Sequence, residues 1–161
     1  MHFNTDQIND LEKIKKINLI NSCSGYKSAN LIGSISKEGI TNVAVFSSVT
    51  HLGSNPPTLG FIVRPTTVPR DTYNNIIESG IFTINHVYED ILEDAHHTSA
   101  KYEEDISEFD ITELEAEYHN DCIAPFVKGS PVQMEMRFVE QYHIKSNNVI
   151  HIIAEIKNLY V

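Results

Sequence analysis

The stretch FSSVTHLGSNPPT at residues 46–58 separates two apolar segments. TNVAV precedes it and LGFIV follows it, and both are typical of strands. A β-hairpin needs only about two to five turn residues. The connecting segment in this chain has roughly twice as many residues. It is rich in hydroxyl groups and also contains an amide, a histidine, a glycine and two prolines. We therefore expect a long polar loop at the end of a buried strand, which either lines a ligand site or simply faces solvent.

The bulk composition limits the classes of protein to consider. A chain of 161 residues with 41% hydrophobic content suffices for a single domain over 1–161 with its own core. The net charge of −10 argues against partners such as nucleic acid or an anionic membrane. No apolar run reaches the about 18 residues of a membrane span, and no signal peptide is recognisable, so we expect a cytoplasmic protein. Two cysteines are too few for a disulfide framework.

The hydrophobic pattern predicts a mainly β fold with attached helices. Within an N-terminal segment 1–25, apolar residues recur every third position over 5–21 and predict a helix packed on the domain surface. A second helix is predicted at 71–80, with Ile76 and Ile77 facing inward. Strands are predicted at 28–36, 40–49, 58–63, 81–87, 124–144 and 149–161. Since these strands lack regular alternation with helices, an antiparallel barrel or sheet is favoured over a doubly wound fold.

Residues 89–121 differ from the rest of the chain because they hold 13 acidic residues and one lysine. We expect an excursion of short helices and loops, with YEDILEDAHH as its clearest helix. Such a run is ordinarily a solvated surface. The alternative is a docking surface for a basic protein partner.

The positions of the arginines indicate an anion pocket. Of only three in the chain, Arg64 and Arg70 stand six residues apart, and a helix is predicted to begin directly after Arg70. Arginine has a planar fork of donors suited to phosphate, and a helix N-terminus adds backbone N–H groups. The alternative is that both arginines pair with Asp71 and surface glutamates. Further donors nearby are the hydroxyls of Thr66, Thr67 and Thr72.

The order of these two segments resembles a known family. The most specific part is SS…NPP…RPTT…RDTYNNI…GIFTINH, and the similarity continues through HHTSAKYEEDISEF at 96–109 and APFVKGSPVQMEM at 124–136. Over roughly residues 27–157 the chain is similar to the flavin reductase-like family of FMN-binding split barrels. The resemblance implies an antiparallel, Greek-key split β-barrel, with FMN as cofactor and a homodimer whose flavins lie close to the subunit interface.

The resemblance also assigns roles to residues. The segment implied to lie along the isoalloxazine ring comprises Phe46, Ser47, Ser48, Val49, Thr50 and Asn55. The residues implied to hold the ribityl phosphate are Arg64, Thr66, Thr67, Arg70, Asp71 and Thr72. HHTSAKY is similar to a segment near the flavin face, which makes His97, Thr98 and Ser99 candidates on the substrate side. Similar proteins usually continue for tens of residues past the position of Val161, so a shortened member and a truncated chain are both open readings.

The implied activity is that of an NAD(P)H-dependent flavin oxidoreductase. NADH, NADPH or another small-molecule donor would supply a hydride to the flavin, and an acceptor would take the electrons. No residue has to act as a covalent nucleophile, and the histidines lack the spacing of a metal site. Two other readings stay open: an electron carrier that meets protein partners, and a protein that binds flavin without turnover. Whether the flavin is a bound cofactor or a substrate is equally open.

Overall fold

The structure is a computed structural model that describes residues 2–103 and 105–161. Its α-helices are α1 Thr5–Asn9, α2 Lys13–Cys23, α3 Asp71–Ser79, α4 Leu92–His97 and α5 Glu108–Ile111, and a 3₁₀ helix, η1, spans Glu89–Ile91. Its strands are β1 Asn30–Ile35, β2 Thr41–Phe46, β3 Thr50–Ser54, β4 Pro57–Val63, β5 Ile81–His86, β6 Ala116–Glu117, β7 Phe126–Val127, β8 Gln133–Ile144 and β9 Val149–Tyr160.

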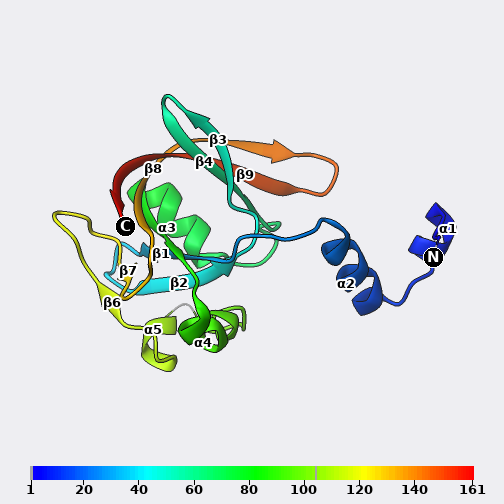
Figure 1. The fold of residues 1–161 in the computed structure, drawn as a ribbon, viewed down its shortest axis with the longest axis horizontal. Helices are drawn as coiled ribbons and strands as arrows, with labels where there is room; N and C mark the ends of the chain where they lie inside the picture. Colours follow the sequence, from blue (N-terminus) through cyan, green and yellow to red (C-terminus); the bar gives the residue numbers. More distant parts are fainter. Residues whose placement is uncertain (1, 104) are drawn as a thin grey trace.

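Seven strands form one curled sheet in the order β2-β1-β5-β8-β9-β4-β3, and every pairing is antiparallel (Figure 1). The expected mainly β, antiparallel architecture is therefore confirmed. The two edges of the sheet, β2 and β3, follow one another in the chain, so residues 47–49 connect one edge to the other. The polar stretch that opened the sequence thus lies at the seam between these two edges.

The core forms where the apolar sides of the strands meet α3. Along β8 the apolar and polar residues alternate, so Met134 and Met136 point inward while Arg137 is exposed. Ile76 of α3 packs into the same cluster, together with Phe61 and Phe82, whose rings meet edge to face. The prediction for the neighbouring Ile77 is wrong, because its side chain is 40% exposed. One face of α3 is therefore fixed against the sheet, which also fixes the position of its N-terminus.

The polar stretch at residues 46–58 is not the long loop that the sequence predicts. Residues 50–63 form a hairpin in which β3 pairs with β4, and only Asn55 and Pro56 separate the two strands. The strand was missed because β3 is an edge strand with mostly exposed side chains, so apolar alternation is not required there. Its register shifts between His51 and Gly53, which also disturbs the pattern.

The N-terminal segment also differs from its prediction. The expected helix over 5–21 is divided into α1 and α2, with Asn4 and Glu12 as their N-caps. Both helices project away from the barrel and neither has a buried residue (Figure 1). Ile14, Ile17 and Ile20 are 63%, 48% and 52% exposed, so the prediction that they pack on the domain surface is wrong. We call residues 2–25 the N-terminal arm.

The acidic excursion contains η1, α4, α5 and β6, in agreement with the expected short helices and loops. It packs along the outer edge of β2 and pairs through β6 with β7. In the part of the chain that the structure describes, no helix is long and apolar enough to cross a membrane.

Candidate functional site

A cavity of about 1200 Å³ lies at the seam of the barrel, and we call it the seam cavity. Its wall is built from five segments: the base of the arm, the end of β2 with the turn into β3, the loop from β4 to α3, the start of α3, and the segment after α4. The predicted site residues that line it are Phe46, Ser47, Ser48, Val49, Thr50, Arg64, Arg70, Asp71, Thr72, Thr98 and Ser99. The remaining predicted residues, Asn55, Thr66, Thr67 and His97, lie outside this lining.

The N-terminus of α3 opens into the seam cavity. Its N-cap residue, Arg70, makes no side-chain capping bond, and the first helical bond runs from Asn74 N–H to the Arg70 carbonyl over 2.9 Å. The backbone N–H groups of 71–73 therefore have no acceptor within the helix. Nε of Arg70 is buried, and no residue that the structure describes accepts its proton. Unpaired donors of this kind favour an anion in the cavity.

The charges around this helix end are consistent with the same role. Among the described residues, only one of the three arginines, Arg137, forms an ion pair, with Glu155 at 2.7 Å on the outside of the sheet. Neither Arg64 nor Arg70 pairs with a carboxylate of the described chain. The alternative that these two arginines pair with Asp71 and surface glutamates is thus not what the structure has. Both guanidinium groups therefore line the seam cavity, and no carboxylate within residues 2–103 and 105–161 is in contact with either of them.

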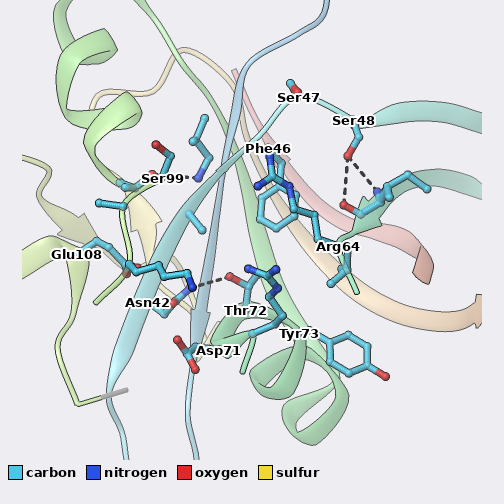
Figure 2. A pocket seen from close by; sticks show the side chains of 18 of the residues that line it. Asn42, Phe46, Ser47, Ser48, Arg64, Asp71, Thr72, Tyr73, Ser99 and Glu108 are labelled. Carbon is cyan, nitrogen blue, oxygen red and sulfur yellow. Dashed lines mark hydrogen bonds between the residues drawn. The ribbon is translucent and has the colours of Figure 1, made fainter. Parts of the chain in front are cut away.

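The opposite wall is the connection from β2 to β3. The ring of Phe46 packs edge to face on Phe61, with centroids 5.2 Å apart. The Ser48 hydroxyl accepts from Ile62 N–H at 3.0 Å and lies 3.4 Å from the Ile62 carbonyl, to which it donates. Figure 2 shows these two bonds, with Phe46 and Arg64 directed into the same space. Ser48 therefore fixes the wall in place, whereas Ser47 is exposed.

A buried polar network lies beneath the cavity, and the sequence analysis missed most of it. Asn42 donates through Nδ2 to the Thr72 hydroxyl over 2.9 Å and also lies 3.4 Å from the Ser34 hydroxyl. Asn75 donates to the same serine over 3.1 Å. Thr72 is only 7% exposed, so its hydroxyl supports the fold as well as facing the cavity. A signal was present, because Asn42 stands among the apolar residues of a predicted strand.

The edge of β2 is covered by side chains from the acidic excursion. Val45 N–H donates to the Thr98 hydroxyl over 3.0 Å, and Val43 N–H donates to Oε2 of Glu108 over 2.9 Å. Thr98 also donates to the carbonyl of Ala95, so both of its hydrogen-bonding roles serve the fold. Such capping satisfies groups that an edge strand otherwise leaves unpaired. Of the three substrate-side candidates, only Ser99 both lines the cavity and is exposed.

Glu108 is an exception to the solvated acidic surface expected for 89–121. Its side chain lines the seam cavity and the residue is only 8% exposed. Burial raises the pKa of this carboxyl above its ordinary value, the N–H donated by Val43 opposes the rise, and the nearby charge of Asp71 adds to it. Nothing in the residue types distinguishes Glu108 from its acidic neighbours, so sequence reasoning had no signal for it.

The comparisons with known proteins now identify the family. The flavin reductase like domain model matches residues 26–161. This chain belongs to the flavin reductase-like family. Among curated proteins, the chain is 28% identical to an uncharacterized protein of Aquifex aeolicus over 74% of its length, and 30% identical to the uncharacterized protein YwrF of Bacillus subtilis over 73%. It spans only 62% and 57% of these two relatives.

Solved structures agree with the family. A split barrel protein of Shewanella frigidimarina, assigned to the flavin reductases, is 48% identical to this chain and superposes with a TM-score of 0.96 over 100% of this chain and 80% of the other. The expected split-barrel fold is therefore confirmed. A 2-nitrobenzoate 2-nitroreductase of Pseudomonas fluorescens has a TM-score of 0.83 at 24% identity, covering 99% of this chain and 76% of its own. Flavoredoxin of Desulfovibrio vulgaris superposes with a TM-score of 0.73 at 22% identity, covering 84% of this chain and 69% of its own. The last two likenesses concern the fold alone.

Proposed function

We propose that the protein is an FMN-binding oxidoreductase of the flavin reductase type, with FMN held in the seam cavity. The observation that carries the proposal is the donor set at the start of α3: the buried Nε of Arg70 has no acceptor among the described residues, and the backbone N–H groups of 71–73 have none within the helix. A phosphate supplies several acceptor oxygens and a double negative charge, which such a set would satisfy. The residues present therefore fit a phosphorylated flavin better than one without phosphate.

The remaining lining residues suit the other parts of the cofactor. Arg64 and Arg70, with the first turn of α3, would hold the phosphate, while residues 46–50 would lie along the ring with backbone groups and the aromatic side of Phe46. When bound, FMN would supply the redox chemistry by taking up a hydride from NADH, NADPH or another donor and yielding electrons to a small-molecule acceptor. The chain would orient the reactants and limit their contact with water.

The size of the seam cavity leaves room for a second reactant. Its volume of about 1200 Å³ exceeds the roughly 300–1,000 Å³ usual for a small-molecule pocket. Space is therefore left beside a flavin for a second reactant. The exposed Ser99 and Lys101 lie on the wall available to it.

We also propose that the functional unit is a homodimer. The outer side of the β8–β9 and β3–β4 hairpins exposes the apolar side chains of Leu52, Tyr142 and Ile144. This apolar side is continuous with the seam cavity through Thr50 and Ile62, which both line it. Covering it with a second copy would shield the mouth of the cavity from water.

The test is consumption of NADH and NADPH by the purified protein, with and without added FMN. The expected result is oxidation of one or both nucleotides that depends on FMN and on the protein. A protein that binds FMN but oxidises neither nucleotide would contradict the reductase proposal. Stopped-flow transfer of electrons from the chemically reduced protein to a partner protein would then identify a carrier, and its absence would identify a flavin-binding protein without turnover.

A further inference from the structure

The N-terminal arm presents an apolar stripe that its own barrel does not cover. Ile14, Ile17 and Ile20 lie on one side of α2, and each is about half exposed. None of the residues of α1 or α2 is buried. The arm nevertheless reaches the barrel at its base, where Asn21 and Ser24 line the seam cavity.

α2 is short for a helix that no other surface supports. Helices shorter than about 12–15 residues are marginal in water, and their stability in proteins comes mainly from packing of an apolar side. α2 has 11 residues, and its one side-chain cap is the bond from Ile14 N–H to Glu12 over 3.2 Å. A further surface is therefore needed to hold α2 as a helix.

The same position of the arm occurs in a relative. The superposition on the Shewanella frigidimarina structure covers 100% of this chain, and its TM-score of 0.96 would be markedly lower if residues 2–25 were displaced. At 48% identity this relative carries more than a shared fold. A projecting arm with a reproducible position indicates a specific partner surface, rather than a loose end.

Charge favours a second copy of this chain as that surface. α2 holds three lysines, Lys13, Lys15 and Lys16, and no acidic residue. Residues 26–161 carry the entire net charge of −10, with nine basic and nineteen acidic side chains. A basic helix with an apolar stripe is thus complementary to the body of another copy, and a twofold arrangement would satisfy both arms at once.

We propose that the arm is exchanged between two copies, so that the apolar stripe of α2 packs on the body of the second copy. Because the arm also forms one wall of the seam cavity, this contact would fix Asn21 and Ser24 in place. The proposal does not rest on the identity of the ligand in that cavity. It requires only that α2 be buried in the assembly and exposed in a single copy.

The test combines light scattering with hydrogen exchange on the full chain. We expect a dimer whose α2 amides are protected, and expect that protection to be lost on dilution below the dissociation constant. Ile17→Asp should raise the dissociation constant at least about tenfold by placing a charge in the contact. Ser22→Asp is the matched control, since it adds the same charge about 140° around the helix from Ile17 and should change the constant less than threefold.

Two outcomes would overturn the exchange. Amides of α2 that exchange as in an unstructured peptide within an intact wild-type dimer would show a free arm. Amides of α2 that stay protected at every concentration, including in a monomer, would show that the arm packs on its own chain. Exchange at the β5 and β8 amides in the same samples reports whether each variant is folded, and the dilution series on the wild type needs no variant at all.

Discussion

The side-chain amide of Asn42 donates to the hydroxyl of Thr72 over 2.9 Å, and this buried bond joins the edge strand β2 to the first turn of α3. One end of the pair leads along β2 to Phe46 and the seam, and the other leads to the free N–H groups at the start of the helix. The two walls of the cavity are therefore connected by a hydrogen bond inside the protein.

Thr72→Val should destabilise the fold. Valine keeps the shape but removes the acceptor, which leaves Nδ2 of Asn42 with only the 3.4 Å contact to Ser34. An unsatisfied buried donor costs about 1–3 kcal/mol, measurable by urea denaturation of the ligand-free protein. The exposed Thr66→Val is the control and should change stability by less than about 0.5 kcal/mol. Equal stability of the two variants would show that the Asn42–Thr72 bond does not support the fold.

Ser48→Ala should loosen the connection from β2 to β3. The change removes the acceptor of Ile62 N–H, and we expect a loss of about 1 kcal/mol with faster hydrogen exchange at the Ile62 amide. Ser47→Ala is the matched control, because that neighbouring side chain is exposed. Unchanged exchange at Ile62 in Ser48→Ala would mean that another group holds the wall.

Glu108→Gln should change the pH dependence of stability. Since burial raises the pKa of Glu108 in the folded chain above its ordinary 4.5, the folded state binds this proton more tightly than the unfolded state. The stabilising contribution of that proton is complete below about pH 4.5 and is lost as the pH rises through the folded-state pKa. Glutamine keeps an oxygen for Val43 N–H and does not ionise.

The difference in Tm between Glu108→Gln and the wild type should therefore grow in favour of the variant as the pH rises from about 4.5 toward neutrality. Differential scanning calorimetry at several pH values measures it. The exposed Glu113→Gln serves as control and should give a flat difference. A difference for Glu108→Gln that is also flat, or that falls with pH, would contradict the role of the buried carboxyl.

Gly33→Ala should be among the most damaging small substitutions in the barrel. A Cβ at this position of β1 would overlap the carbonyl oxygen of Pro125 and approach the Thr83 hydroxyl to 2.6 Å. Overpacking against backbone costs about 1–3 kcal/mol or more, and thermal denaturation would report it. Gly53→Ala meets only the Thr58 hydroxyl at 3.2 Å and the Pro56 carbonyl at 3.5 Å, and should cost clearly less. Similar losses for both variants would count against a tight contact at Gly33.

Much of the fold was predictable because burial follows the period of each element. β9 buries every second residue at Ile150, Ile152 and Ala154, and Gly80, whose φ of 74° suits glycine, caps the C-terminus of α3. The arm was not predictable, because an apolar period predicts that a side is covered without saying which molecule covers it. β3 was missed for the related reason that an exposed edge strand needs no apolar alternation.

Some residues of the candidate site could likewise be predicted from the sequence, and others could not. Arg70 and the start of α3 were recognisable because adjacent donors and a helix start are local features of the sequence. Glu108 and Thr98 act on β2 from more than fifty residues away, so their contacts arise only when the chain folds. Thr66 and Thr67 are neighbours of the arginines in sequence, yet the loop places them outside the cavity lining.

The most direct test of the central claim is equilibrium binding of FMN and riboflavin, by fluorescence titration, to the wild type, Arg70→Ala and Arg137→Ala. We expect FMN to bind the wild type at least about tenfold more tightly than riboflavin, because only FMN presents a phosphate to Arg70 and α3. Arg70→Ala should weaken FMN binding by about 2–3 kcal/mol and leave riboflavin nearly unchanged. Arg137, paired with Glu155 on the outer side, should be dispensable for both. Equal affinities of the wild type for the two flavins, or equal losses in the two arginine variants, would contradict a phosphate site at the start of α3.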